Sequence, residues 1–251
     1  MPNKPAAAAL PSKPRSVGDF HHSLARAVRP VWRSTLANIR PILLIQGGGL
    51  LLVLAYYSLT SFRAVCQSIA EWKKQSNPAW ASLSCILAAV ILPELAKCLT
   101  GPRPVPNRAY FRHLLVLCGF FALGGFLVDR FYLLQAWIFG DNTLPLTILK
   151  KVLVDQFIYS AFWCAPYAVL WFLWEEENLS FARTWRRINL PLLTERIPAV
   201  VVANWIFWIP LITCIYCLPV GLQFPVCLAA QGAWSLLLVT LTRAPHHAST
   251  T

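Results

Sequence analysis

A long uncharged stretch near the C-terminus constrains the fold of this chain more than any other sequence feature. No Asp, Glu, Lys or Arg occurs between Arg196 and Arg243. A helix needs about 20 apolar residues to cross a bilayer, and strands and core helices of soluble domains are shorter than this stretch. The stretch therefore predicts two membrane-spanning helices. Pro219, Gly221 and Pro225 mark the turn between them.

The composition of the whole chain extends this prediction. Of the 251 residues, 57% are hydrophobic and only 13% are charged, whereas soluble domains are about half apolar and about a quarter charged. So few charges do not cover the surface of a soluble protein of this length. We therefore predict an all-α polytopic transmembrane bundle of about six apolar helices, four to six of them true spans, with additional interfacial amphipathic helices.

Six apolar segments follow a polar start. They cover residues 41–62, 78–95, 113–139, 152–174, 197–218 and 222–241. The Asp129-Arg130 pair interrupts the third segment, which is why the number of true spans stays open. The domain organisation is then a basic tail with an amphipathic segment (1–40), a transmembrane domain (41–243) and a short C-terminal tail (244–251).

The basic residues between the segments predict the topology. If the N-terminus is inside and all six segments span, sixteen Lys and Arg lie on the inner side and six on the outer side. Cytoplasmic loops carry the excess of basic residues, so both termini are predicted on the inner side. The basic N-terminal tail fits a mitochondrial presequence, a helix on an anionic leaflet, or a solvated tail.

The net charge of +12 raises the question of nucleic-acid binding, since basic patches bind phosphates. Here the basic residues lie between apolar segments, where they set topology instead. We therefore expect a lipid bilayer as partner and no nucleic acid.

The region 175–196 predicts a short helix in the membrane interface. Phe181, Trp185 and Ile188 recur at helical spacing, with Asn178 as the expected N-cap and Pro191 as the expected stop. Arginines occupy the opposite face of this helix, as in helices that lie on a membrane surface.

Motifs of catalysis and cofactor binding are missing from the sequence. There is no His-Glu-x-x-His, Gly-x-Ser-x-Gly or phosphate-binding loop. Cys214 and Cys217 have metal or redox spacing, but a structural zinc site needs four ligands, and small residues three apart on an apolar helix favour close packing. We expect no enzymatic activity, no cofactor, and no catalytic or metal-binding residue.

Ionisable residues inside the apolar segments are the main functional candidates. A charge at mid-bilayer costs about 3 kcal/mol on insertion scales, so such residues face a bundle interior or a wet cavity. Asp155-Gln156 and Asp129 are of this kind, and we expect them to line a polar pocket toward the outer side. Lys151 lies four residues before Asp155 and could pair with it on one helix face. The alternative is that these acids only form structural pairs near the ends of the spans.

The fifth segment adds Asn204 and Pro210. Pro210 removes a backbone donor and should kink the helix, and the freed carbonyl group then needs another partner in a membrane. Asn204 is expected either in a cavity wall or in a packing contact between helices. The pore or cavity candidates are therefore Asp155, Gln156, Asn204 and Asp129.

These polar positions and nearby tryptophans resemble the Mpv-seventeen family, which includes the twenty-two-kilodalton peroxisomal membrane protein. The resemblance covers roughly residues 115–240 and is strongest over 150–240. The proline that the family has directly after its second Trp is displaced to Pro210. The residues that carry the family pattern are Lys150, Lys151, Asp155, Gln156, Asn204, Trp205, Trp208, Pro219 and Trp234.

The resemblance implies a small multi-helix protein of the mitochondrial inner or peroxisomal membrane, with outlying prokaryotic members, and some members are described as channels. For this chain we favour a bacterial plasma membrane over the two organelles. The expected function is a non-enzymatic channel or permeability protein for small solutes or ions. A structural or interaction protein without a conduit is the alternative, and an intramembrane enzyme ranks third. A homo-oligomer is a further expectation, formed through Ser84, Cys85, Ala88 and Ala89.

Overall fold

The computed structural model describes residues 39–100 and 106–243. Within this part every regular element is helical, as predicted. Most of the tail predicted for residues 1–40, and the tail predicted for 244–251, lie outside the described residues. The elements, with η denoting a π-helical segment, are α2 (Ile39–Ser58), α3 (Thr60–Gln75), α4 (Ala79–Ile86), η1 (Leu87–Ile91), α5 (Leu92–Thr100), α6 (Arg108–Phe139), α7 (Pro145–Val154), η2 (Asp155–Cys164), α8 (Ala165–Glu176), α9 (Phe181–Arg187), η3 (Leu192–Arg196), α10 (Ile197–Tyr216) and α11 (Val220–Arg243).

Five of the described helices are long and apolar enough to cross a membrane. They are Ile39–Ser58, Ala79–Leu99, Arg108–Phe139, Pro145–Glu176 and Leu192–Tyr216, with lengths of 20 to 32 residues. A shorter apolar helix, Val220–Ala233, corresponds to the start of the sixth predicted segment. The third segment is one continuous helix, so the Asp129-Arg130 pair does not split it.

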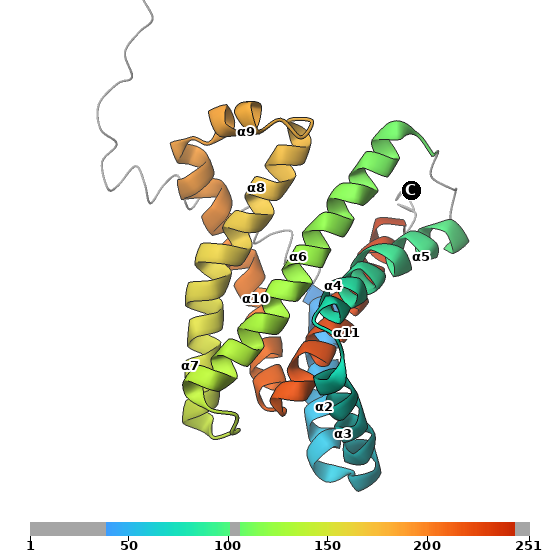
Figure 1. Cartoon of the computed structure of the whole chain (residues 1–251), viewed down its shortest axis with the longest axis vertical. Coiled ribbons are helices and arrows are strands. Elements are labelled where there is room, and N and C mark those ends of the chain that lie inside the picture. The colour runs from blue at the N-terminus through green and yellow to red at the C-terminus, as the bar shows by residue number, and fades with distance from the viewer. Residues whose placement is uncertain (1–38, 101–105, 244–251) are drawn as a thin grey trace, which may run out of the picture.

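The long helices run past one another between two ends of the molecule (Figure 1). The start of α6 and the short helix α9 lie at one end, and the connection from α6 to α7 and the turn from α2 to α3 lie at the opposite end. At the first end, His113 Nδ1 of α6 lies 2.6 Å from Glu175 Oε1 of α8. The loop before α6 and the loop that contains α9, both predicted on the inner side, therefore lie at the same end of the molecule.

The helix α3 covers most of the region between the first two predicted apolar segments, 41–62 and 78–95. The apolar segment ends at Ser58, because Leu59 adopts an extended conformation that separates α2 from α3. Cys66 and Ala70 of α3 are buried in a cluster with residues of the α10–α11 turn. A Cβ atom on Gly221 would lie 2.9 Å from the Cβ atom of Ala70, so glycine permits this close contact between α3 and α11.

The helix α9 confirms a short helix in the 175–196 region but corrects its start. Ser180 is the N-cap, whereas Asn178 lies in the preceding turn with φ of 53°. The Asn178 side chain instead accepts a hydrogen bond of 2.9 Å from Arg112 of α6. Phe181 and Trp185 are both 77% exposed.

Each π-helical segment ends two residues before a proline, namely Pro93, Pro166 and Pro198. Proline has no N–H, and its ring clashes with the carbonyl group four residues earlier. A π-helix bonds each N–H to the carbonyl group five residues earlier and is therefore wider. We attribute the three π-helical segments to this relief of the proline clash.

The proline inside α10 is accommodated differently. Pro210 cannot donate to the carbonyl group of Ile206, four residues earlier. The Gln46 side chain of α2 donates to the carbonyl oxygens of Ile206, at 2.9 Å, and Phe207, at 3.0 Å. A side chain from another helix thus satisfies the backbone group that the proline leaves without a partner.

A close contact between helices joins α6 to the small residues of α4 and η1. A Cβ atom on Gly125 of α6 would lie 2.5 Å from Cys85 Sγ and 2.7 Å from the Ala81 carbonyl oxygen. Ser84, Cys85 and Ala89 are all buried within the chain. Within the described chain, α6 and α11 already contact this stripe, where Ala88 is half-buried, and a homo-oligomer stays a prediction.

Candidate functional site

A cavity of about 260 Å³ lies between α4, α6, η2, α8, α10 and α11. Most of its wall is apolar and aromatic. Its polar wall is formed by Asp155, Gln156, Ser160, Asn204 and Gln231. The described residues that line it include no Lys, Arg or His, and Asp155 is their single carboxylate. Three of the four predicted site residues, Asp155, Gln156 and Asn204, are thus brought together here.

Asp155 is the first residue of η2 and is 6% exposed. The Tyr216 hydroxyl group donates to Asp155 Oδ2 at 2.6 Å, and Gln156 Nε2 donates to Oδ1 at 2.7 Å. Within the described part of the chain no cation pairs with this carboxylate. Gln156 is 2% exposed, and its Oε1 is buried without a hydrogen-bond partner.

Tyr216 connects Asp155 to Gln135 of α6 through a second hydrogen bond. Gln135 Nε2 donates to the Tyr216 hydroxyl oxygen at 2.6 Å and to the Lys151 carbonyl oxygen at 3.2 Å. Lys151 is only 1% exposed, and its Nζ lies 5.8 Å from the centre of the Tyr216 ring. The expected ion pair between Lys151 and Asp155 is therefore corrected: the ammonium group faces an aromatic ring, and Tyr216 bonds the carboxylate.

Two further hydrogen bonds fix η2 against α10. Asn204 Nδ2 donates to Ser160 Oγ at 2.6 Å, and Trp205 Nε1 donates to the Gln156 carbonyl oxygen at 2.8 Å. The π-helical segment thus presents Asp155, Gln156 and Ser160 toward the same neighbouring helices. This arrangement could hold a small ligand that donates hydrogen bonds to acceptors on η2.

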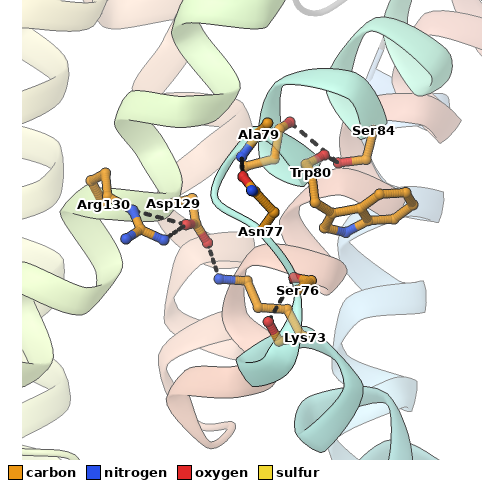
Figure 2. A network of polar contacts seen from close by, with 9 residues as sticks. Lys73, Ser76, Asn77, Ala79, Trp80, Ser84, Asp129 and Arg130 are labelled. Carbon is orange, nitrogen blue, oxygen red and sulfur yellow. Dashed lines mark hydrogen bonds and ion pairs between the residues drawn. The ribbon is translucent and has the colours of Figure 1, made fainter.

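The structure places Asp129, the fourth predicted site residue, elsewhere. It is 2% exposed and forms ion pairs with Lys73 of α3 and with Arg130 (Figure 2). Lys73 is positioned at the end of α3, where the Ser76 hydroxyl group donates to the Lys73 carbonyl oxygen at 2.7 Å. Asp129 is not among the described residues that line the cavity, and its ion pairs match the structural alternative.

The remaining residues of the family pattern fall at different places. Trp208 lines the cavity, Lys150 is exposed, and Pro219 lies in the turn between α10 and α11. Trp234 belongs to α11, but its side chain lies outside the described residues.

Metal binding gains no support from the described residues, since no group of three or more His, Cys, Asp or Glu side chains is placed to hold an ion. Cys214 and Cys217 are half-buried free thiols at the end of α10.

Sequence reasoning missed Tyr216, Gln135 and Ser160, which complete the polar network. A signal was present, because each is an uncharged polar side chain within an apolar segment, and such groups need partners in a span. It also missed Lys73 as the partner of Asp129, because α3 was not expected as a helix.

Comparison of the chain with protein-family models, curated proteins and solved structures finds no match in any of the three. The resemblance to the Mpv-seventeen family therefore stays a prediction that depends on the residues quoted above.

Proposed function

We propose that the chain is an integral membrane protein and that lipid surrounds its long helices. Large apolar side chains point outward along these helices, among them Leu44, Leu51, Leu115, Trp137 and Phe162, which are 67% to 82% exposed. Soluble monomers rarely expose apolar surface on this scale. The five long apolar helices support the same proposal.

We further propose that the protein is a permeability protein for small solutes, without enzymatic activity. The observation that carries this proposal is the convergence of Asp155, Gln156 and Asn204 on one cavity. Polar groups are expensive at bilayer depth and mark solute or ion pathways when they face a cavity. Ligand cavities also lie between helices of bundles, with a few polar groups in an apolar wall.

A structural protein without a conduit is the second candidate. The Asn204–Ser160 and Gln156–Asp155 hydrogen bonds favour it, because polar residues also hold membrane helices together without any solute. Membership of the Mpv-seventeen family, a bacterial plasma membrane and homo-oligomerisation remain parts of the proposal that depend on the sequence alone.

Solute flux into reconstituted vesicles separates the two candidates. Purified full-length protein is reconstituted, and swelling is followed by stopped-flow light scattering with glycerol, urea, potassium chloride and methylammonium chloride. The wild type should raise the permeability to at least one solute above that of empty vesicles. Asp155→Asn should change this permeability, whereas Glu71→Gln, an exposed charge on α3, should not.

Two results would count against a conduit that passes Asp155. Folded protein without any flux above empty vesicles would favour the structural role. Flux that is identical in wild type and Asp155→Asn would show that the solute does not pass Asp155.

A further inference from the structure

The chemistry of the cavity wall defines the class of ligand that fits it. Aromatic side chains make up much of the wall, including Phe120, Tyr159, Trp163, Tyr167 and Trp208. Aromatic faces attract cations, and this attraction strengthens when water is excluded. The wall therefore combines a surface for an apolar ligand body with a preference for positive charge.

The charges agree with this preference. Asp155 is the single carboxylate among the described lining residues, and no basic side chain offsets it there. Lys151, with its Nζ 5.8 Å from the centre of the Tyr216 ring, is the cation of the network but does not line the cavity. A buried carboxylate without a paired cation is unfavourable, so a cationic ligand at Asp155 would supply the missing charge.

The hydrogen-bonding groups of the cavity wall restrict the class of ligand further. Each carboxylate oxygen of Asp155 accepts one hydrogen bond from the protein, although an ionised carboxylate can accept more. Gln156 Oε1 is buried and accepts none. Gln156 Oε1 and the unused lone pairs of Asp155 are acceptors on this wall, so a ligand beside these two residues should bring N–H donors as well as charge.

We propose, building on the proposed function, that the cavity binds a protonated amine with a small apolar or aromatic body. Its ammonium group lies beside Asp155 and Gln156, and its apolar body lies against the aromatic wall. The volume of about 260 Å³ is below the range of about 300–1,000 Å³ for pockets of drug-sized ligands, which restricts the ligand to small amines.

Isothermal titration of detergent-purified full-length protein with three matched probes tests this proposal. Phenethylamine carries charge and N–H donors, benzyltrimethylammonium carries charge without N–H donors, and 3-phenylpropanoate carries the opposite charge. Saturable binding is expected to be tightest for phenethylamine, weaker for benzyltrimethylammonium and absent for 3-phenylpropanoate.

Substitutions locate the binding. Asp155→Asn should weaken phenethylamine binding about tenfold or more, since it removes a charge-assisted hydrogen bond, and Glu71→Gln should leave it unchanged. Gln156→Leu should weaken phenethylamine binding more than benzyltrimethylammonium binding. Trp163→Leu, which leaves Asp155, Gln156, Ser160 and Asn204 in place, should weaken the binding of both cationic probes, so the test does not depend on Asp155→Asn folding correctly.

Equal binding of all three probes, or equal phenethylamine binding to wild type and to every variant, would mean partition into detergent and would overturn the proposal. The outcome is distinguishable from that of the flux experiment. Amine binding without solute flux would contradict the proposed conduit and support the amine-binding site. Flux of other solutes without amine binding would support the conduit and contradict the amine-binding site.

Discussion

At the scale of single residues, the buried ion pair between Asp129 and Lys73 has a structural role. Asp129 and Lys73 are 2% and 11% exposed, and each is the other's partner across α6 and α3 (Figure 2). Removing one member of a buried ion pair leaves a charge uncompensated, whereas removing both is often tolerated. Asp129 therefore contributes to attaching α3 to the bundle.

Asp129→Asn should lower the free energy of unfolding by about 3–5 kcal/mol, measured by denaturant titration in detergent. The double variant Lys73→Met/Asp129→Asn should lose less than the sum of the two single variants. The exposed pair Lys74–Glu71 on the same helix provides the control, and Glu71→Gln should cause no measurable change. Additive losses in the double variant would show that Lys73 and Asp129 do not interact.

The hydrogen bonds of Gln46 exist because Pro210 lacks an N–H. Gln46→Leu should therefore destabilise the protein by about 1–3 kcal/mol, since the Ile206 carbonyl group loses its partner. In a Pro210→Ala background the helix can bond this carbonyl group itself, so the same substitution should have a smaller effect. Thermal unfolding of the four proteins measures the coupling, and an equal effect in both backgrounds would refute this explanation of Gln46.

At the scale of elements, the crossing of α4 and α6 depends on a missing side chain at Gly125. The neighbouring Gly124 has open space around its Cβ position, so the two glycines form a matched pair. Gly125→Ala should destabilise the protein by about 1–3 kcal/mol through overcrowding. Gly124→Ala should be neutral or stabilising by up to about 1 kcal/mol, because alanine favours helix. Equal shifts of the thermal unfolding midpoint in Gly125→Ala and Gly124→Ala would contradict the close contact of α4 and α6 at Gly125.

Sequence reasoning predicted the long helices well but not their local form. The uncharged stretch and the six apolar segments follow directly from the solvent preference of the side chains, and the structure has helices in each. The π-helical segments were missed, although Pro93, Pro166 and Pro198 were visible in the sequence, because a proline predicts a disturbance without saying which one forms. The helix α3 was missed because only its Cys66–Ala70 face is buried.

At the scale of the whole molecule, the sequence pattern predicted which polar residues are important but not which of them lie together in the candidate site. Asp155, Gln156 and Asn204 were selected because polar groups in apolar segments need partners, and that argument holds for each residue alone. It cannot say which of them meet, since contacts between η2 and α10 depend on helix rotation and on the π-helical turns. Asp129 met the same criterion but lies in the ion pairs with Lys73 and Arg130 instead of the cavity wall.

The sidedness of the chain in sealed vesicles tests most directly the claim that its helices cross a bilayer. In a cysteine-free background, one cysteine is retained at the exposed Cys98 of α5 or introduced as Thr143→Cys in the exposed connection between α6 and α7. A membrane-impermeant maleimide is then applied outside oriented vesicles. We predict that one position reacts at once and the other only after the vesicles are opened. Reaction of both positions from the same side would contradict a membrane-spanning α6 and, with it, the proposed path through the bundle.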